Sequence, residues 1–329
     1  MLLHRLAPPR PPKPSFSRTI QATISPNTGH FQLHFYVPND YVLQQRLRRK
    51  RFPVVVNFHG GGFTLGTASD DARWAQCVVS QVNAVVVAVD YRLAPEHAFP
   101  TPVEDGVDAV KYITEHCEDL LIDPDRMAIS GFSSGGNMTF TVPLRMQEET
   151  IMTRRKSKDL FIISESHQLK IKALCAWYPP TDYTVTREER RATCLRKDQE
   201  LPAMFTNLFD ESYLQPPTLD MAHPYLSPGK APTDMLAKLP EDIIMYTCEW
   251  DMLLAEGEKM RDRLRNDFGK NVRYRMVPGV PHGWDKAPNP LKVTPGVWDH
   301  YLNACKDLKE VLRTPKGAKP RRFSTFMSV

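Results

Sequence analysis

Short apolar runs recur along the chain, and most are followed by a stretch with the spacing of a helix. They occupy residues 53–58, 84–89, 127–130, 171–177 and 243–248, and residues 272–277 are expected to form a last strand. Near-continuous apolar runs of this length are typical of strands that are buried on both faces of a parallel sheet. The alternation of strands and helices predicts an α/β protein whose parallel strands are joined by right-handed crossovers.

The stretches between these runs predict helices on the two faces of the sheet. In residues 103–116, the apolar Val107, Val110 and Ile113 share one face, and the first turn is acidic. Further helices are expected over residues 70–81, from Gly136 onward, over 255–268 and over 297–313. Ahead of the first buried run, two alternating segments flank a set of turn residues and predict a β-hairpin. These two segments are residues 19–24 and 30–37.

Three segments depart from the alternation of strand and helix. Residues 184–225 are helical, charged and then Pro-containing, and we expect them to lie over the carboxyl edge of the sheet as a lid. The chain begins with a Pro-rich stretch, and residues 314–329 are basic with few structure signals. We expect a single domain over residues 1–313, with 1–30 and 184–225 as cap or lid segments and 314–329 as a tail.

Charge excludes some partners. The 43 Lys and Arg residues exceed the 38 Asp and Glu residues by only 5, and they cluster near residues 46–51 and 316–322. No aromatic-interleaved basic face accompanies these clusters, so we expect no nucleic-acid partner.

The six cysteines form no CxxC pair and have no zinc-type spacing with histidine, which predicts reduced thiols and no metal. The start of the chain lacks a sustained apolar region, and no run is long enough to cross a bilayer. We therefore expect a soluble cytoplasmic protein.

The chemistry is centred on Gly131-Phe132-Ser133-Ser134-Gly135, which lies between a buried strand and the start of a helix. A Ser flanked by Gly in that position is the pattern of a nucleophile elbow. The sharp turn needs small neighbours, and it exposes the Ser133 hydroxyl at a helix N-terminus, which favours developing negative charge.

A serine nucleophile needs a base, and the base needs an acid. His282 follows the last strand in a Pro- and Gly-containing loop, and Asp251 follows the preceding strand. Both therefore belong to the same edge of a parallel sheet as Ser133, where open α/β sheets bind ligands. Glu249 and Asp285 are rival acids, since both lie nearby in the sequence.

Two other histidines are rival bases. His59 abuts a glycine turn, which we expect it to orient, and His97 lies in a Pro-bounded loop. The glycine turn, His59-Gly60-Gly61-Gly62, follows a buried strand and suits an oxyanion hole. We expect the N–H groups of Gly61, Gly62 and Ser134 to be its donors.

Four motifs together resemble those of the hormone-sensitive-lipase-like carboxylesterases, which are α/β-hydrolases. They are His59-Gly60-Gly61-Gly62-Phe63, Asp90-Tyr91-Arg92-Leu93-Ala94-Pro95-Glu96, Gly131-Phe132-Ser133-Ser134-Gly135-Gly136-Asn137 and Pro281-His282-Gly283. The resemblance covers roughly residues 50 to 310. It implies the α/β-hydrolase fold: a mostly parallel, twisted sheet with helices on both faces and a small helical lid. It further implies ester hydrolysis through an acyl-enzyme, without a metal or organic cofactor.

The resemblance also implies supporting roles and shows two departures. Asp90, Arg92 and Glu96 are expected to brace the loops behind the triad. The Pro that usually follows the acid in this family is Met252 here, and little but a Pro-rich segment stands where such enzymes carry an N-terminal cap.

Aromatic residues near the expected site are candidates for the walls of a substrate pocket. They are Phe63, Trp74, Phe132, Phe205, Phe209, Tyr213 and Trp284.

The leading hypothesis is a serine esterase for carboxylic esters of small to medium size. The same triad would also cleave thioesters or lactones, for example a carrier-protein-bound acyl group in a specialised biosynthetic pathway. A long-chain lipase and a non-catalytic small-molecule-binding module are further alternatives, and the presence of His282 argues against the latter. The family resemblance also raises a homodimer, although no interface is evident in the sequence.

Overall fold

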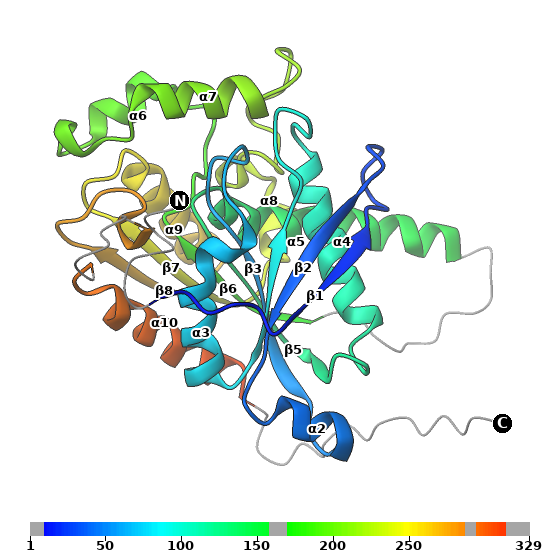
Figure 1. Ribbon diagram of the computed structural model, residues 1–329. Helices are drawn as coiled ribbons and strands as arrows, with labels where there is room; N and C mark the ends of the chain where they lie inside the picture. The colour runs from blue at the N-terminus through cyan, green and yellow to red at the C-terminus, as the bar shows by residue number, and fades with distance from the viewer. Residues whose placement is uncertain (1–9, 158–169, 287–293, 314–329) are drawn as a thin grey trace.

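Eight strands form one sheet in the order β1-β2-β4-β3-β5-β6-β7-β8 (Figure 1). The computed structural model describes residues 10–157, 170–286 and 294–313. The strands are β1 Phe16–Gln21, β2 His30–Tyr36, β3 Phe52–Phe58, β4 Val85–Asp90, β5 Ile122–Phe132, β6 Ile171–Trp177, β7 Asp242–Cys248 and β8 Asn271–Val277. β2 is antiparallel to both β1 and β4, and every other neighbouring pair is parallel. The predicted hairpin and the predicted parallel sheet are thus both confirmed.

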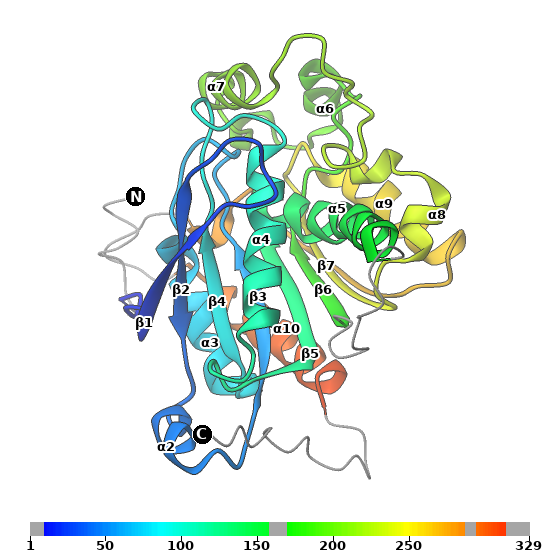
Figure 2. The same ribbon diagram turned by 90° about the vertical axis from the view of Figure 1, so that its right-hand side faces the viewer.

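Helices cover both faces of the sheet, as Figure 2 shows. One face carries α3 (Ala72–Val82) and α10 (Val297–Val311), and their apolar residues form one buried cluster with β-strand side chains. The other face carries α4 (Thr101–Glu115), α5 (Ser134–Ser157) and α9 (Leu254–Asn266), which pack into a second, larger cluster. Each helix lies within a few residues of its predicted position, because its apolar positions repeat at the helical period.

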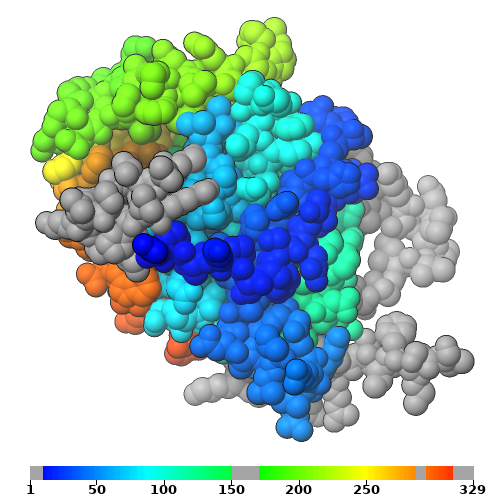
Figure 3. Space-filling model, in the orientation of Figure 1, coloured from blue at the N-terminus to red at the C-terminus, as the bar shows by residue number. Residues whose placement is uncertain are grey.

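The segment 184–225, called the lid from here on, lies beyond the carboxyl ends of the strands (Figure 1). It contains α6 (Arg187–Thr193), η2 (Lys197–Gln199) and α7 (Ala203–Tyr213). α6 begins with a capping box, in which Thr186 Oγ1 accepts from Glu189 N and the Glu189 carboxylate accepts from Thr186 N. In the space-filling view, the green lid forms a continuous rim above the cyan segments (Figure 3).

The remaining elements are short and connect the layers. They are α2 (Tyr41–Leu47), η1 (Ala68–Asp71), η3 (Pro228–Lys230), α8 (Thr233–Ala237) and η4 (Trp284–Lys286). Within the described ranges, every helix is too short or too polar to span a bilayer. The basic tail predicted at 314–329 and the start of the chain at 1–9 lie outside the described residues.

Candidate active site

Ser133 lies in a tight turn between β5 and α5. Its φ of +53° is a left-handed conformation that is uncommon for a residue with a side chain. The turn closes so tightly that a Cβ on Gly131 would lie 2.1 Å from the carbonyl oxygen of Gly135. A Cβ on Gly135 would lie 2.0 Å from the carbonyl oxygen of Phe58 in β3. These contacts explain why glycine flanks the serine on both sides.

Ser133, His282 and Asp251 form a continuous hydrogen-bonded relay. Ser133 Oγ lies 2.8 Å from His282 Nε2, and His282 Nδ1 lies 2.6 Å from Asp251 Oδ2. Asp251 is 2% exposed, and its other carboxylate oxygen accepts from the backbone N–H of Leu253 at 3.0 Å. Both oxygens of the Asp251 carboxylate therefore have hydrogen-bond partners, and the His282 imidazole lies between this carboxylate and the Ser133 hydroxyl.

Parallel strands bring the three residues together. Ser133 directly follows β5, Asp251 lies in the loop after β7, and His282 lies in the loop after β8. The two outer loops are joined by backbone hydrogen bonds from Glu249 N to Val277 O and from Trp250 N to Val280 O, each 3.0 Å long. This pairing holds the loop of Asp251 beside the loop of His282.

The rival acids have other partners in the structure. The Glu249 carboxylate accepts from Gly279 N at 2.6 Å and so braces the loop that carries the imidazole. Asp285 is buried, accepts from the hydroxyls of Tyr178 and Tyr301, and pairs with Lys286 Nζ at 2.9 Å. Burial alone would raise the pKa of Asp285, but Lys286 and the two phenols outweigh it and hold this pKa below its usual value.

The rival bases are likewise placed away from the Ser133 hydroxyl. His59 is buried, its ring stacks on Tyr91 at 4.2 Å, and its Nδ1 lies 2.8 Å from the carbonyl oxygen of Gly60. His97 is half-buried in the loop before α4. Within the described residues, the imidazole beside the serine is that of His282.

The glycine loop after β3 lies next to the nucleophile. A Cβ on Gly60 would lie 3.3 Å from Ser133 Cβ. Gly61 and Gly62 have φ values of +124° and +61°, and a Cβ on Gly61 would lie 1.9 Å from Leu65 O. Only glycine fits this path at Gly61, and the loop packs against the turn that carries Ser133.

The loops behind the site are braced by two of the three expected residues. Asp90 accepts from Ala68 N at 2.8 Å. The Arg92 guanidinium pairs with the buried Asp105 of α4 at 2.6 Å and also donates to Asn27 O at 2.6 Å. Glu96 is exposed, and among the described residues it has no hydrogen bond or ion pair that would give it the expected bracing role.

The candidate pocket aromatics divide into core and lid residues. Phe132 is fully buried among Trp74 and Trp177, and Phe63 is fully buried in a stack on Tyr213. The structure therefore places both rings in the core rather than on the wall of a pocket.

The other candidates lie at the edge of the site or on the lid. Trp284 is 3% exposed and packs edge-on against His300. On α7, Phe205 is 37% exposed, whereas the ring of Phe209 lies so close to Gly62 that a Cβ there would approach it to 2.2 Å. Phe209 is thus the aromatic residue that joins the lid to the glycine loop.

Tyr178 is a site residue that the sequence pattern did not reveal. It directly follows β6, has a φ of +38°, and packs its ring edge-on against His282 with 4.8 Å between centroids. Its position just past a strand end, next to two prolines, is the sequence feature that could have identified it as a site residue. Within the described ranges, no cluster of His, Cys, Asp and Glu is arranged to hold a metal ion.

Known proteins share this pattern of sequence and structure. A family model for the alpha/beta hydrolase fold matches residues 55–286. Arylacetamide deacetylase-like 2 of Homo sapiens is 28% identical over 299 residues, which covers 75% of this chain and 71% of that protein. Carboxylesterase 20 of Arabidopsis thaliana is 27% identical over 287 residues, or 83% of this chain and 78% of that protein. A solved esterase of Pyrobaculum calidifontis is 27% identical, with a TM-score of 0.72 over 94% of this chain and 89% of that one.

Proposed function

Because the chain belongs to the hormone-sensitive-lipase-like carboxylesterases of the α/β-hydrolase fold family, it is a carboxylic ester hydrolase, and we propose that Ser133, His282 and Asp251 perform its chemistry. The observation that carries this assignment is the relay of 2.8 Å and 2.6 Å through the imidazole. A nucleophile, a base and an orienting acid in hydrogen-bond contact are the requirement for acyl transfer through an acyl-enzyme.

In the first step, Ser133 Oγ attacks the ester carbonyl carbon. His282 Nε2 takes the hydroxyl proton, and Asp251 holds the ring in the productive tautomer while stabilising the imidazolium that forms. The same imidazolium then gives its proton to the leaving alcohol, which leaves the acyl group on Ser133. In the second step, His282 removes a proton from water, the resulting hydroxide attacks the acyl-enzyme, and the acid product leaves.

Each step passes through a tetrahedral oxyanion, which needs hydrogen-bond donors. The N–H groups of Gly61, Gly62 and Ser134 are our candidates. Ser134 begins α5, where unpaired N–H groups and the helix dipole favour negative charge. The proximity of Gly60 to Ser133 supports the glycine pair, since it brings that loop to the reacting carbon. Loss of one such donor typically costs about 3 kcal/mol of transition-state stabilisation.

The substrates we propose are esters with acyl groups of small to medium size. Phe209 of the lid packs directly on Gly62, so the roof of the site lies close to the glycine loop that would receive the carbonyl oxygen. A roof this near limits the length and width of the acyl group that fits beneath it.

A p-nitrophenyl ester series from acetyl to long acyl chains, measured with wild type and Ser133→Ala, tests this function. We expect rapid wild-type turnover of the short esters and a loss of about 10³-fold or more in the variant. A folded wild-type protein that turns over none of these esters, or a variant that retains wild-type rates, would contradict the proposal.

A further inference from the structure

An arginine of the lid is buried in the body of the protein. Arg190 of α6 is 3% exposed, and its Nε lies 2.7 Å from Oε2 of Glu256 in α9. Its Nη2 donates to Asp182 O at 2.5 Å, and its guanidinium lies 5.1 Å from the centre of the Tyr183 ring. A buried guanidinium is costly unless it is paired, so Arg190 depends on Glu256.

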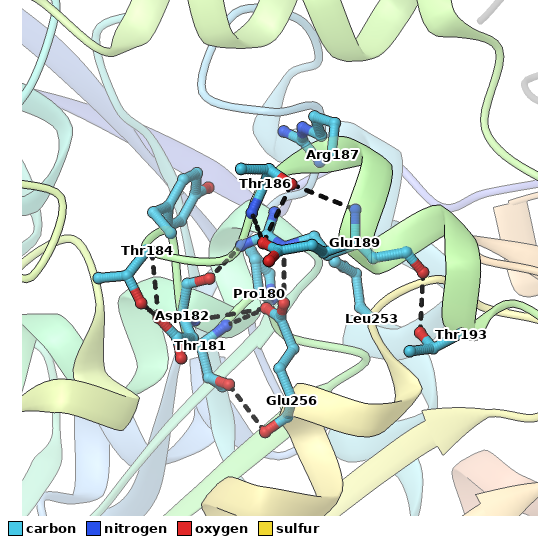
Figure 4. A network of polar contacts seen from close by, with 12 residues as sticks. Pro180, Thr181, Asp182, Thr184, Thr186, Arg187, Glu189, Thr193, Leu253 and Glu256 are labelled. Atoms are coloured by element: carbon cyan, nitrogen blue, oxygen red, sulfur yellow. Dashed lines mark hydrogen bonds and ion pairs between the residues drawn. The ribbon is translucent and has the colours of Figure 1, made fainter.

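Glu256 connects three parts of the molecule (Figure 4). Its carboxylate accepts from Thr181 N at 2.7 Å, and its backbone oxygen accepts from Thr181 Oγ1 at 3.0 Å. Thr181 lies in the loop after β6, and Glu256 lies on the helix that follows the loop of the proposed acid Asp251. The ion pair between Arg190 and Glu256, called the lid anchor below, therefore fixes α6 to the frame of the site.

Other ion pairs of the lid hold its own parts together. Arg187 of α6 pairs with Asp210 of α7 at 2.6 Å, so α6 and α7 are coupled to each other. Because α7 also carries Phe209, which packs on Gly62, a displacement of α6 would be transmitted to the roof of the site.

A cavity lies beside the lid anchor. Its volume is about 330 Å³, and it lies between α6 and α9. Besides the anchor residues, its lining includes Thr184, Val185, Glu189, Thr193, Met252 and Lys259. This space lies directly beside the ion pair and leaves room for either side chain to change its conformation.

We propose that the lid anchor determines the size of ester that the active site admits. With the ion pair intact, α6 is held against α9 and Phe209 stays on Gly62, which favours small acyl groups. With the pair broken, the lid can rise from the glycine loop and admit larger acyl groups. This inference rests on the proposed function of Ser133, because it concerns access to that site.

The anchor responds to pH in a defined direction. Burial raises the pKa of Glu256 to about 7, although Arg190 and the N–H groups of Thr181 and Asp182 oppose the rise. As pH falls through about 7, the carboxylate is protonated and its ion pair with Arg190 is lost.

The charged groups that face Glu256 come from every neighbouring element. They are Arg190 of α6, Asp182 with its partner Lys230 of η3, and Glu189 and Lys259 on the cavity wall. Of the charged groups nearest the carboxylate, Arg190 lowers the pKa of Glu256 and Asp182 raises it. Burial is the largest cause of the raised pKa. The admitted size should therefore increase as pH falls from 8 to 6.

The test is the ratio of kcat/KM for p-nitrophenyl octanoate to that for p-nitrophenyl acetate, measured at pH 6 and pH 8. The ratio cancels the pH dependence of the shared chemistry, since both esters use the same nucleophile and the same base. We expect the wild-type ratio to be about fivefold higher at pH 6 than at pH 8, as a modest coupling free energy gives. Glu256→Gln, which is uncharged at both pH values, should show the high ratio at both.

One control variant separates the anchor from a general loss of charge. Asp307→Asn removes the negative charge from the ion pair between Asp307 of α10 and Arg275 of β8, whose atoms lie 2.5 Å apart. This pair lies outside the lid, so the variant should follow wild type.

The outcomes distinguish this inference from the proposed function. A wild-type ratio that is the same at pH 6 and pH 8 would overturn the role of the anchor, and this measurement needs no variant that might fail to fold. A folded Glu256→Gln protein with the wild-type ratio at pH 8 would overturn it as well. In both cases, acetate turnover that depends on Ser133 would leave the esterase function intact.

Discussion

At the scale of single residues, the site depends on strained or crowded positions. Ser133 has a φ of +53° and Tyr178 has a φ of +38°, and both lie just past a strand end. Such conformations persist only where the surroundings over-determine them. Here the surroundings are Gly131 and Gly135, whose missing side chains let β3, β5 and α5 meet behind the serine.

Asp251→Asn tests the role of the acid at this scale. The amide is nearly isosteric, but it donates where the carboxylate accepts, so it would favour the wrong tautomer of His282. We expect kcat for p-nitrophenyl acetate to fall by about 10⁴-fold with little change in KM. Steady-state kinetics on a variant with wild-type circular dichroism would measure this, and a fall of less than about tenfold would argue against Asp251 as the acid.

The residue types of the site were readable from the sequence, but the directions of several side chains were not. Ser133 and Asp251 each follow a buried apolar strand, and His282 follows the last strand of the sheet. Those positions were enough to predict that the three residues lie at one edge of the sheet. Phe132 was expected in the pocket only because it lies next to Ser133 in the sequence. In a strand, residues two apart share a face, and Ser130, which accepts from Trp74 Nε1 at 3.0 Å, marks that face as the α3 side.

At the scale of elements, buried strands were the most predictable features. β6 occupies the predicted residues 171–177, and its last five residues, 173–177, are all apolar and buried. β5 begins at Ile122, earlier than predicted, because its first residues alternate in burial and include polar side chains. A register shift between the pairs Phe52–Ile122 and Val54–Met127 separates this half-buried portion from the apolar one.

Arg92→Met tests how the elements behind the site are held. The change removes the partner of the fully buried Asp105 and the hydrogen bond from the guanidinium to Asn27 O in the hairpin turn. We expect the free energy of unfolding to fall by about 3–5 kcal/mol, since an uncompensated buried charge remains. Urea denaturation would measure the change.

The matched control is Asp198→Asn, which breaks the exposed pair with Arg196. Its side chains are 45% and 60% exposed, and such pairs contribute at most about 1 kcal/mol. Equal losses in the two variants would contradict the structural role given to Arg92.

At the scale of the whole molecule, long-range contacts determine how the lid is attached, which the sequence pattern does not predict. The lid was predicted as a segment over the sheet edge, but its attachment was not. Arg190 and Glu256 lie on the charged helices α6 and α9, and from the sequence either side chain would be expected to face solvent. Only the folded chain brings them to 2.7 Å from each other in a buried position. The coupling of lid and site is therefore a property of the tertiary structure.

The proposed function depends on an acyl-enzyme at Ser133. The most direct test is intact-protein and peptide mass spectrometry after treatment with a fluorophosphonate, from which an activated serine oxygen displaces fluoride to form a stable phosphonyl ester. We expect one adduct per chain, on the peptide that contains Ser133, with loss of ester turnover in proportion to labelling. Ser133→Ala should remain unlabelled. Labelling at another residue, or full turnover by a fully labelled protein, would show that Ser133 is not the nucleophile.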